Sequence, residues 1–291
     1  MLVVTAPERR YVITFGCPDR TGIIARISGF LAEHGGWIVE AAYHTDPDTG
    51  WFFTRQVVRA DSLPFDAAEL RARFGEVAAD LSADSNWQVT DTGERRRAVI
   101  LVSKAGHCLY DLLGRVASGE LDVDIAAVIG NHESLGDITR AHGIPFHHVP
   151  FPAGGKAEAF EEVRKLVGEH EPHAVVLARF MQILPADLCR EWAGRAINIH
   201  HSFLPSFIGA KPYHQAHTRG VKLVGATCHY VTADLDAGPI IEQDVIRVGH
   251  GDSVEDMVRK GRDIEKVTLA RGLRWHLENR VLVHGNRTVV F

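Results

Sequence analysis

The apolar and polar positions of this 291-residue chain follow two successive patterns. Up to about residue 90, apolar runs with the length of strands alternate with two stretches in which the apolar residues share one helical face. The expected strands are residues 11–15, 37–45, 51–58 and 87–90, and the expected helices are residues 23–34 and 64–81. The order βαββαβ predicts a ferredoxin-like domain over residues 1–90.

The pattern changes after a polar segment, residues 91–97, which we interpret as a linker. Beyond it, several short runs are apolar throughout, as strands of a parallel sheet covered on both faces must be. These runs are residues 98–103, 125–129, 174–178 and 196–199. Helical segments lie between them, so residues 98–291 are predicted to form an α/β, doubly wound, mainly parallel, Rossmann-like domain.

The end of the chain departs from this alternation. Residues 223–232 and 239–248 are predicted to be two long strands joined by a turn. Ser253, with an acid three residues later at Asp256, predicts a capped helix that continues to about residue 280. A terminal hairpin is expected to turn at residues 285–286.

Two segments carry candidate chemistry. Asn198 and His200 are two residues apart on one predicted strand, so their side chains face the same side, at the strand end where α/β sheets bind ligands. The turn near residue 236 carries Asp234 and Asp236, and a carboxylate facing the other two groups would complete a hydrolytic set. From spacing alone, two other interpretations remain open. Asn198 and His200 could be polar residues that only close a strand end, and the two aspartates could serve only the turn.

Composition narrows the class of protein. The chain is 45% hydrophobic and 24% charged, which is typical of a folded globular protein and not of a disordered chain or a coiled coil. A net charge of −5 gives no bulk attraction to nucleic acid or to an anionic membrane. No apolar run approaches the roughly 20 residues that span a bilayer, and the N-terminus does not have the pattern of a secretory signal. Four scattered cysteines favour a reducing cytoplasm.

Seventeen histidines raise the alternative of a zinc hydrolase. The candidate ligands are His147, His148, His200, His201, His214, His217 and Asp236. None of them has the spacing of a known zinc motif, so no metal is expected. The segment that begins at Lys104 matches neither the dinucleotide fingerprint nor the Walker motif, so no nucleotide cofactor is expected either.

Two motifs in order give the chain a family resemblance. The run Asn-x-His-x-Ser-x-Leu-Pro at residues 198–205 and Leu-Asp-x-Gly-Pro at residues 235–239 resemble those of the folate-dependent formyltransferase superfamily. Within it, the doubled histidine at 200–201 and the stretches 178–184 and 207–216 resemble the formyltetrahydrofolate deformylase family. The first domain, with its loop at residues 17–22, resembles the ACT domain that these enzymes carry.

This resemblance implies a reaction. It is the hydrolysis of the linear amide of 10-formyltetrahydrofolate to formate and tetrahydrofolate, which supplies formate for purine biosynthesis and balances the folate pools. Water is the nucleophile and no prosthetic group is needed. Asn198 would stabilise the oxyanion, and His200 would donate to the same oxygen or move protons. Asp236 would orient His200 and accept from the attacking water.

The same resemblance implies where the folate binds. The pterin pocket is expected at two short segments, and His201 is expected to shape the water site. The pocket residues are Met181, Gln182, Ile183, Leu184, Ala233, Asp234 and Leu235. For Met181, Ile183 and Leu184, plain core positions are the alternative. His201 could equally be an exposed loop histidine, and Asp234 could be structural.

The loop from Ser103 to Cys108 departs from the Gly-Ser-Asn-rich loop of the superfamily's glycinamide ribonucleotide transformylases. A phosphoribosyl acceptor is therefore not expected. Two alternatives to the hydrolase remain open at this point. One is a formyltransferase with an unknown acceptor, and the other is a non-catalytic sensor of folate or amino acids.

The first domain suggests partners. A small amino acid such as glycine or methionine is expected to bind at Asp19, Arg20, Thr21 and Gly22, ahead of the first helix. The alternative is that Asp19 or Thr21 only caps that helix. Because a domain of this kind exposes strand edges, a homo-oligomer held partly by residues 1–90 is also expected.

Overall fold

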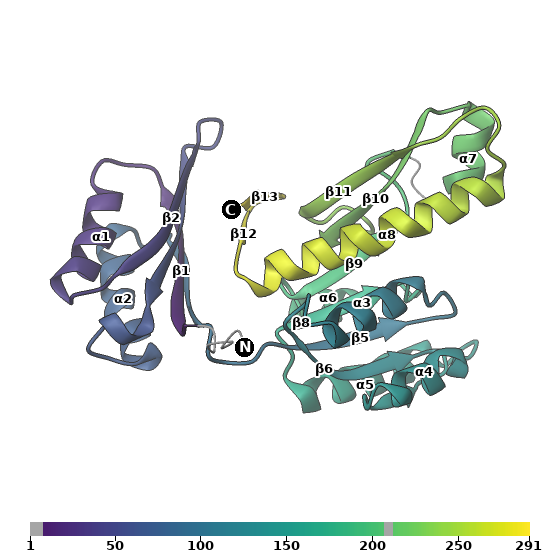
Figure 1. The fold of residues 1–291 in the computed structure, drawn as a ribbon, viewed down its shortest axis with the longest axis horizontal. Helices are drawn as coiled ribbons and strands as arrows, with labels where there is room; N and C mark the ends of the chain where they lie inside the picture. The colour runs from purple at the N-terminus through teal and green to yellow at the C-terminus, as the bar shows by residue number, and fades with distance from the viewer. Residues whose placement is uncertain (1–7, 207–211) are drawn as a thin grey trace, which may run out of the picture. The chain divides into compact units, whose positions relative to one another are not determined.

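The computed structural model describes residues 8–206 and 212–291 and divides the chain into two compact units (Figure 1). The first unit comprises Met1–Arg95 with two C-terminal pieces, Asn279–Leu282 and Val289–Phe291, and the second comprises Arg96–Glu278 with Val283–Thr288. Residues 207–211 of the loop expected at 207–216 thus lie outside the described residues, and residues 212–216 belong to a helix. The functional domain boundaries, 1–90 and 98–291, stay a prediction.

The first unit is built on a four-stranded antiparallel sheet with strand order β2-β3-β1-β4. Its strands are β1 (Arg10–Pro18), β2 (Ile38–Asp46), β3 (Trp51–Arg59) and β4 (Asn86–Asp91). Its helices are α1 (Ile23–Glu33), the short 3-10 helix η1 (Ala60–Ser62) and α2 (Ala67–Leu81). This order confirms the predicted βαββαβ pattern.

Helix α2 begins three residues later than expected. Asp66 is its N-cap, and its side chain accepts a hydrogen bond from the backbone N–H of Glu69 at 2.9 Å. An N-cap residue has extended backbone, so the helix cannot start before it. Periodicity alone does not locate this boundary.

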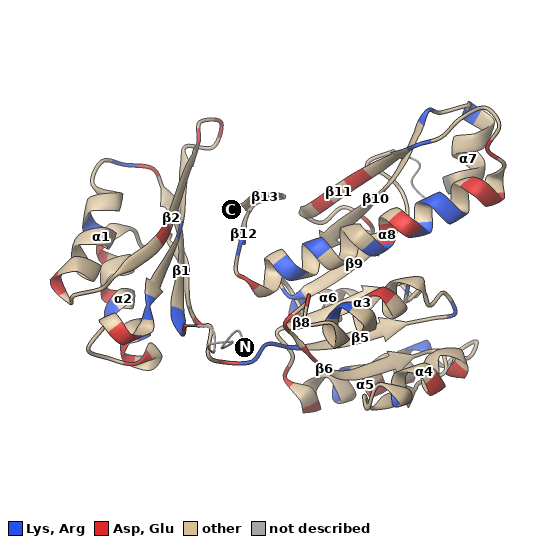
Figure 2. Ribbon diagram, in the orientation of Figure 1, with Lys and Arg blue, Asp and Glu red and all other residues tan. Residues whose placement is uncertain are grey.

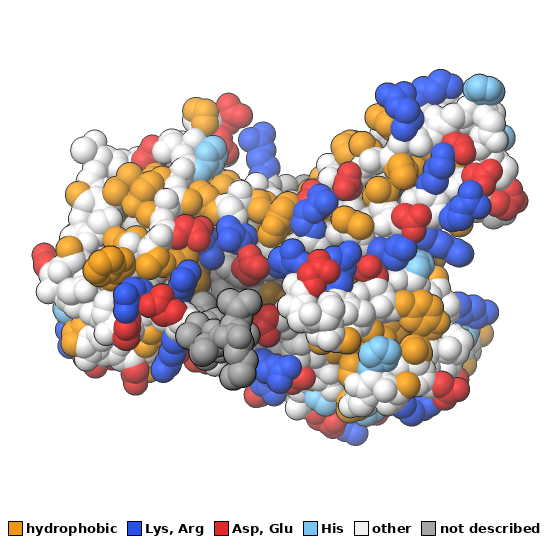
Figure 3. Space-filling view, in the orientation of Figure 1, with side chains coloured by type: hydrophobic (Ala, Val, Ile, Leu, Met, Phe, Trp, Pro, Cys, Tyr) orange, Lys and Arg blue, Asp and Glu red, His pale blue; other side chains and the backbone are white. Residues whose placement is uncertain are grey.

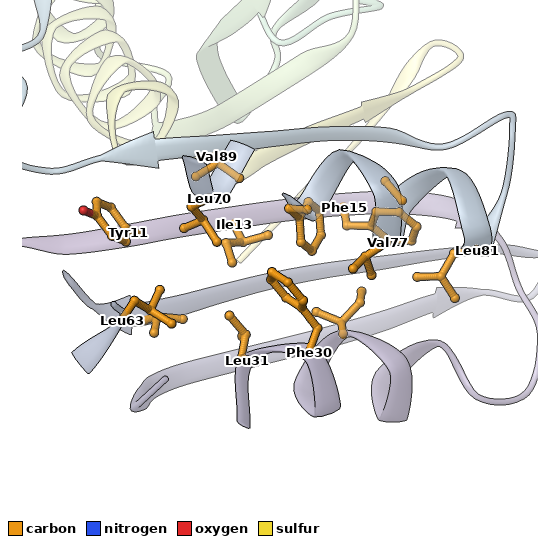
Figure 4. Close-up of a cluster of buried hydrophobic side chains, with 14 of the residues drawn as sticks. Tyr11, Ile13, Phe15, Phe30, Leu31, Leu63, Leu70, Val77, Leu81 and Val89 are labelled. Atoms are coloured by element: carbon orange, nitrogen blue, oxygen red, sulfur yellow. The ribbon is translucent and has the colours of Figure 1, made fainter. Parts of the chain in front are cut away.

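The core of the first unit lies between the sheet and its two helices (Figure 4). Phe15 from β1 and Phe30 from α1 both meet Phe74 of α2 at ring-centroid distances of 6.2 Å, in edge-on arrangements. Ile13 and Leu70 are fully buried beside them. These are the apolar positions whose spacing predicted the two helices and the first strand.

The second unit is built on a seven-stranded sheet with strand order β11-β10-β9-β8-β5-β6-β7. Strands β5 to β9 pair in parallel, and β10 and β11 are antiparallel to their neighbours, which confirms the predicted mainly parallel, doubly wound sheet. The strands are β5 (Arg97–Val102), β6 (Asp124–Gly130), β7 (Phe146–His148), β8 (Ala174–Ala178), β9 (Ala196–His200), β10 (Leu223–Tyr230) and β11 (Ile240–Arg247).

Helices connect these strands (Figure 1). They are α3 (His107–Ala117), η2 (Glu133–Leu135), α4 (Gly136–Ala141), α5 (Lys156–His170), α6 (Ala186–Glu191), α7 (Pro212–Arg219) and α8 (Val254–Leu277). The capping box predicted at the start of α8 is present, with Ser253 and Asp256 each bonding the other's backbone N–H. Charged residues of both signs occur along the length of this helix (Figure 2). The C-terminal hairpin, β12 (Val281–His284) and β13 (Arg287–Val290), turns where it was expected.

Strand β7 was not predicted. It has three residues, two of which are His147 and His148, so it lacks the apolar run that marked the other strands. All four cysteines are buried and free, in agreement with the absence of a disulfide framework in the sequence. Across the described ranges, no helix has both the length and the apolar character needed to cross a membrane.

Candidate active site

The predicted polar pair lies on β9. Asn198 pairs in parallel with Leu177 of β8, so both strands are near their carboxyl ends at this point. On the other side, β10 runs antiparallel, with His229 opposite Asn198 and Thr227 opposite His200. Side chains opposite each other on neighbouring strands share a face. The sheet therefore gathers a carboxamide and two imidazoles.

Asp236 completes this group from the turn after β10. Its Oδ1 lies 3.2 Å from His200 Nδ1 and 3.8 Å from His229 Nε2. Asn198 Nδ2 donates to His229 Nε2 at 3.2 Å, and His229 Nδ1 donates to the carbonyl oxygen of Tyr230 at 2.9 Å. These bonds fix His229 as a neutral imidazole with its proton on Nδ1. We name Asn198, His200, His229 and Asp236 the strand-end cluster.

The charges of the strand-end cluster follow from its contacts. Burial raises the pKa of Asp236, but the hydrogen bond from His200 and the charges of nearby histidines outweigh burial and leave the pKa below its ordinary value. Burial lowers the pKa of His229. Asp236 is therefore a carboxylate and His229 is neutral at neutral pH. His200 is 6% exposed, and its Nε2 is buried without a hydrogen-bond partner among the described residues.

The turn that carries Asp236 has a constrained backbone. Asp236 has φ 54°, in the left-handed region, which costs a non-glycine residue free energy. Two residues on, a Cβ at Gly238 would lie 1.9 Å from the carbonyl oxygen of Tyr230, so only glycine fits. The close approach is maintained by the Tyr230 N–H, which donates to the Pro239 carbonyl at 2.9 Å. This explains the Leu-Asp-x-Gly-Pro spacing found in the sequence.

Hydrogen bonds hold the loop after β9 against the neighbouring strands β10 and β11. Thr227 Oγ1 accepts from the Leu204 N–H at 3.0 Å and donates to the Ser202 carbonyl at 2.9 Å. Gln243 of β11 donates to the Leu204 carbonyl at 2.9 Å. The imidazole of His201 stacks on that of His200, with ring centroids 5.1 Å apart. His201 is thus not an exposed loop histidine.

A pocket opens beside the strand-end cluster. It is lined by Asn198, His229 and Asp236 and by residues of the two segments that the resemblance implied. Those residues are Gln182, Ile183, Leu184, Ala233 and Leu235, with Leu177, Cys189, Val231 and Thr232 completing the walls. Ile183 is 68% exposed and Leu235 60% exposed, although both are large and apolar. Exposed apolar side chains around a polar centre are typical of a ligand site.

Three other predicted residues lie near this pocket without lining it. Met181 is 61% exposed and has φ 59°, and its side chain is outside the pocket wall. Asp234 belongs to the same turn as Asp236, and its carbonyl accepts from the Thr232 hydroxyl at 3.0 Å. His201 lines a separate small pocket with Tyr213 and Ser202. Their roles in substrate binding stay predictions.

The predicted effector residues lie in the first unit. Gly22 is the N-cap of α1 and has φ 96°, and the helix end receives no side-chain cap. The alternative in which Asp19 or Thr21 caps this helix is therefore wrong, because neither side chain bonds it. Arg20 donates to the carbonyl of Asp80 at 3.2 Å. Effector binding itself stays a prediction.

Sequence reasoning missed His229. It belongs to a strand that was predicted, but nothing in a single sequence states that β10 pairs with β9. The signal that could have found it is alternation. His229 is a polar residue between Cys228 and Tyr230 in a strand that is buried along most of its length.

A second group of titratable residues lies in the same unit. His107, Cys108 and Glu265 have potential ligand atoms within 4.8 Å of one another. Both carboxylate oxygens of Glu265 already accept hydrogen bonds, from His107 at 2.8 Å and from Tyr213 at 2.9 Å. Arg179 Nε lies 3.5 Å from the same carboxylate, and its positive charge opposes a cation. This donor set does not fit a metal ion.

Family comparisons support this geometry. Residues 96–273 match the formyl transferase family and residues 11–70 match the ACT domain. A formyltetrahydrofolate deformylase of Corynebacterium sp. (strain P-1) is 46% identical over 97% of this chain and 98% of its own.

Two crystal structures of formyltetrahydrofolate deformylases share the fold. That from Pseudomonas syringae pv. tomato has 59% identity and a TM-score of 0.95, and covers 97% of this chain and 94% of its own. That from Burkholderia mallei has 43% identity and a TM-score of 0.91, and covers 97% of this chain and 99% of its own. The likeness extends over both units, and so, as the sequence motifs implied, the chain belongs to the formyltetrahydrofolate deformylase family.

Proposed function

We propose that the chain hydrolyses 10-formyltetrahydrofolate to formate and tetrahydrofolate, which supplies formate for purine biosynthesis and balances the one-carbon folate pools. The observation that carries this function is the His200–Asp236 pair, whose carboxylate lines an open pocket beside Asn198. The carboxylate accepts from His200 Nδ1 at 3.2 Å, which leaves Nε2 buried and unpartnered among the described residues. We infer that this nitrogen exchanges a proton with a substrate held next to Asn198 and Asp236.

In the first step, water attacks the formyl carbon and the carbon–oxygen bond forms. His200 Nε2 accepts the proton of the water, and the Asp236 carboxylate stabilises the imidazolium that results. The carbonyl electrons become an oxyanion. Asn198 has two amide protons and uses one of them on His229, so the second is free to donate to this oxyanion.

In the second step, the carbon–nitrogen bond breaks. The oxyanion electrons return to the carbon, and the His200 imidazolium gives its proton to the departing nitrogen of tetrahydrofolate. Formic acid leaves with the oxygen of the water and releases its remaining proton to solvent to become formate, and His200 is neutral again. His229 stays neutral throughout and acts as a support for Asn198. No step in this sequence requires a metal or a prosthetic group.

The pterin ring is proposed to bind between the segments 182–184 and 233–235. Both segments offer backbone N–H and C=O groups, which suit the amide-like edge of a pterin. Ile183 and Leu235 provide apolar surface for its faces. Met181, beside the rim, is proposed to cover the ring when substrate is bound.

The direct test is an incubation with 10-formyltetrahydrofolate as the sole organic substrate. We expect equal amounts of formate and tetrahydrofolate, and no change after treatment with a chelator. Turnover that appears only after an amine acceptor is added would favour a formyltransferase. Folate binding without turnover would favour a sensor. Loss of activity on chelation, with recovery on adding zinc, would contradict the metal-free mechanism.

The first unit is proposed to bind a small amino acid and to join chains into a homo-oligomer. Apolar side chains are exposed on this unit (Figure 3), including Trp37, Tyr43 and Trp87. The uncapped start of α1 offers N–H groups to a carboxylate. Calorimetry with glycine and with methionine, together with light scattering, tests both ideas. A reducing cytoplasm is proposed as the compartment, because the four cysteines are free.

A further inference from the structure

The seven-stranded sheet of the second unit changes its direction of growth at β5. From β5 the chain adds β6 and then β7 on one side, and it later adds β8 and β9 on the other side. The loops that leave β5 and β8 therefore diverge at the carboxyl ends of these strands. In doubly wound sheets, the crevice at such a point is where ligands bind. In this protein, side chains of the chain itself occupy it.

A carboxylate with two basic partners lies in this crevice. Val102 and Ala178, the last residues of β5 and β8, pair with each other in the sheet. Arg179 directly follows β8, and His107 begins α3, the helix after β5. Glu265 of α8 meets both, because it accepts a hydrogen bond from His107 at 2.8 Å and lies 3.5 Å from Arg179 Nε. The carboxylate thus connects the two diverging loops.

A tyrosine packs into the same place. The Tyr213 hydroxyl donates to Glu265 at 2.9 Å, and a Cβ at Gly261 would lie 2.0 Å from that hydroxyl, so α8 makes room for the phenol. Glu265 is 1% exposed and Tyr213 is 7% exposed. We name His107, Arg179, Tyr213 and Glu265 the Glu265 cluster. Because its members are bonded through one buried carboxylate, they fill the crevice.

The backbone of Arg179 indicates that its side chain has a purpose in the crevice. Arg179 has φ 64°, in the left-handed region that favours glycine. Such a conformation costs free energy and persists where the surrounding structure imposes it. The side chain is 16% exposed, so it is directed into the protein. A glycine would suit this backbone and leave the crevice more open, but the chain carries a long side chain there.

The pocket and the Glu265 cluster lie on opposite faces of the same sheet edge. A Cβ at Gly272 of α8 would lie 2.5 Å from Cys228 Sγ, so the side chain of Cys228 faces α8. Successive side chains of a strand point to opposite faces, so His229 faces away from α8. Asn198, opposite His229, shares that face and lines the pocket. Glu265 is on α8 and therefore belongs to the other face.

The two faces meet at the proposed reacting centre. His201 stacks on His200 at a centroid distance of 5.1 Å and meets Tyr213 at 6.1 Å, so ring contacts connect the centre to the Glu265 cluster. With a folate in the pocket, a second substrate must reach the formyl carbon from the opposite side, which is the side of this cluster. Water is small enough to do so, whereas an amine with a carbon skeleton would clash with the cluster.

We propose that the Glu265 cluster makes water the acceptor of the formyl group. It fills the crevice through which a primary amine would otherwise reach the formyl carbon, and so restricts the reaction to hydrolysis. Arg179 is the main specificity-determining residue, because it places a long side chain where the backbone favours glycine. This inference rests on the proposed function, since it needs a formyl group held beside Asn198.

The test compares a hollowed variant with a filled control. The hollowed variant, Arg179→Gly with Glu265→Ala, empties the crevice and removes both charges together, so that neither is left buried without its partner. The filled control, Arg179→Met with Glu265→Gln, also removes both charges but keeps side chains of similar size. Circular dichroism first establishes that each variant is folded. Arg179→Gly alone, at a backbone that favours glycine, is the second variant if the hollowed one does not fold.

Each protein is incubated with 10-formyltetrahydrofolate and glycinamide, a small primary amine, and formate and N-formylglycinamide are measured by mass spectrometry. In the transfer reaction, the amine nitrogen bonds to the formyl carbon, the bond to the folate nitrogen breaks, and the proton of the amine passes through His200 to that nitrogen. We expect formate alone from the wild type and from the filled control. The hollowed variant should raise the ratio of N-formylglycinamide to formate by roughly tenfold or more, the scale on which pocket shape discriminates between substrates. A merely structural role would lower stability or kcat and leave this ratio unchanged.

The proposal is overturned if the hollowed variant makes tetrahydrofolate but no more N-formylglycinamide than the wild type, or if the filled control makes as much as the hollowed variant. A crystal structure of the hollowed variant soaked with glycinamide gives a result that needs no turnover. We expect the amine in the vacated crevice, and a crevice without it contradicts the proposal.

Failure of the proposed function gives a different result. The wild type would then release no formate from 10-formyltetrahydrofolate alone, while the soaked crystal would still report on the crevice. Formyl transfer to glycinamide by the wild type, with the Glu265 cluster intact, would overturn the exclusion of amines and favour a formyltransferase.

Discussion

The second unit contains two largely buried carboxylate–histidine pairs that differ in how completely the carboxylate is satisfied. Asp236 accepts one hydrogen bond, from His200, and lies in a strained turn at the wall of a pocket. Glu265 lies on the inner face of a 24-residue helix and accepts two hydrogen bonds, with a guanidinium in addition. The comparison teaches that a pair with spare capacity, facing open space, suits chemistry, and that a saturated pair suits positioning.

The largest effect is expected from the pair with spare capacity. Asp236→Asn keeps the size of the side chain but cannot stabilise an imidazolium. By analogy with other acid–histidine pairs, kcat should fall about 10³–10⁴-fold. The thermal unfolding midpoint should change little, because the site is on the surface of a pocket. Single-turnover kinetics measure the first, and calorimetry the second. Near-wild-type turnover would remove the assigned role.

In the pair formed by Glu265 and His107, substitution of the carboxylate should mainly lower the stability of the fold. Glu265→Ala leaves Arg179 and His107 buried without their partner. Breaking a buried ion pair from one side costs about 3–5 kcal/mol, so the free energy of unfolding should fall by this order. Denaturant titration measures it, with the substitution of an exposed acid, Glu161→Ala, as control. A change below about 1 kcal/mol would indicate that Glu265 is not tightly bound in this way.

His276 sharpens the comparison because, among the described residues, its hydrogen-bond partners are a hydroxyl and a backbone carbonyl and not a carboxylate. His276 bonds the Tyr230 hydroxyl and the carbonyl of His173, and burial lowers its pKa to about 4. An unfolded histidine titrates near 6.5, so the unfolded chain binds more protons between the two values. The free energy of unfolding should therefore fall as pH decreases from about 6.5 towards 4. Urea titrations across this window measure the slope.

His276→Gln provides the matched control. It should reduce that slope by about 1 kcal/mol per pH unit, since one group that is protonated only in the unfolded state contributes at most about 1.4 kcal/mol per pH unit. His201, whose pKa is also about 4, contributes a similar slope that remains in this variant. An unchanged slope in His276→Gln would show that His276 is not held neutral in the folded protein.

The sequence predicts the parts of the site that depend on local spacing. The two-residue periodicity of a strand predicts that Asn198 and His200 share one face, and the Leu-Asp-x-Gly-Pro motif indicates Asp236. The fold class followed from apolar runs that parallel strands require. The start of α8 followed from a capping box that is readable within four residues.

The rest depends on contacts between distant segments. His229 joins the site only because β10 pairs with β9, and Glu265 meets His107 across 158 positions of chain. The backbone conformation of Arg179 leaves no trace in composition or periodicity. Such features depend on tertiary contacts between segments that are distant in the sequence. Periodicity carries no information about which elements become neighbours.

The lack of space at Gly238 limits which positions around the pocket can accept substitutions. Asp236, the proposed partner of His200, lies in a turn in which Gly238 leaves no room for a side chain against the Tyr230 carbonyl. Residues at the pocket rim, such as Ile183 and Leu235, are under no such constraint. Laboratory evolution towards other formamides should therefore accumulate substitutions at the rim and leave the turn unaltered.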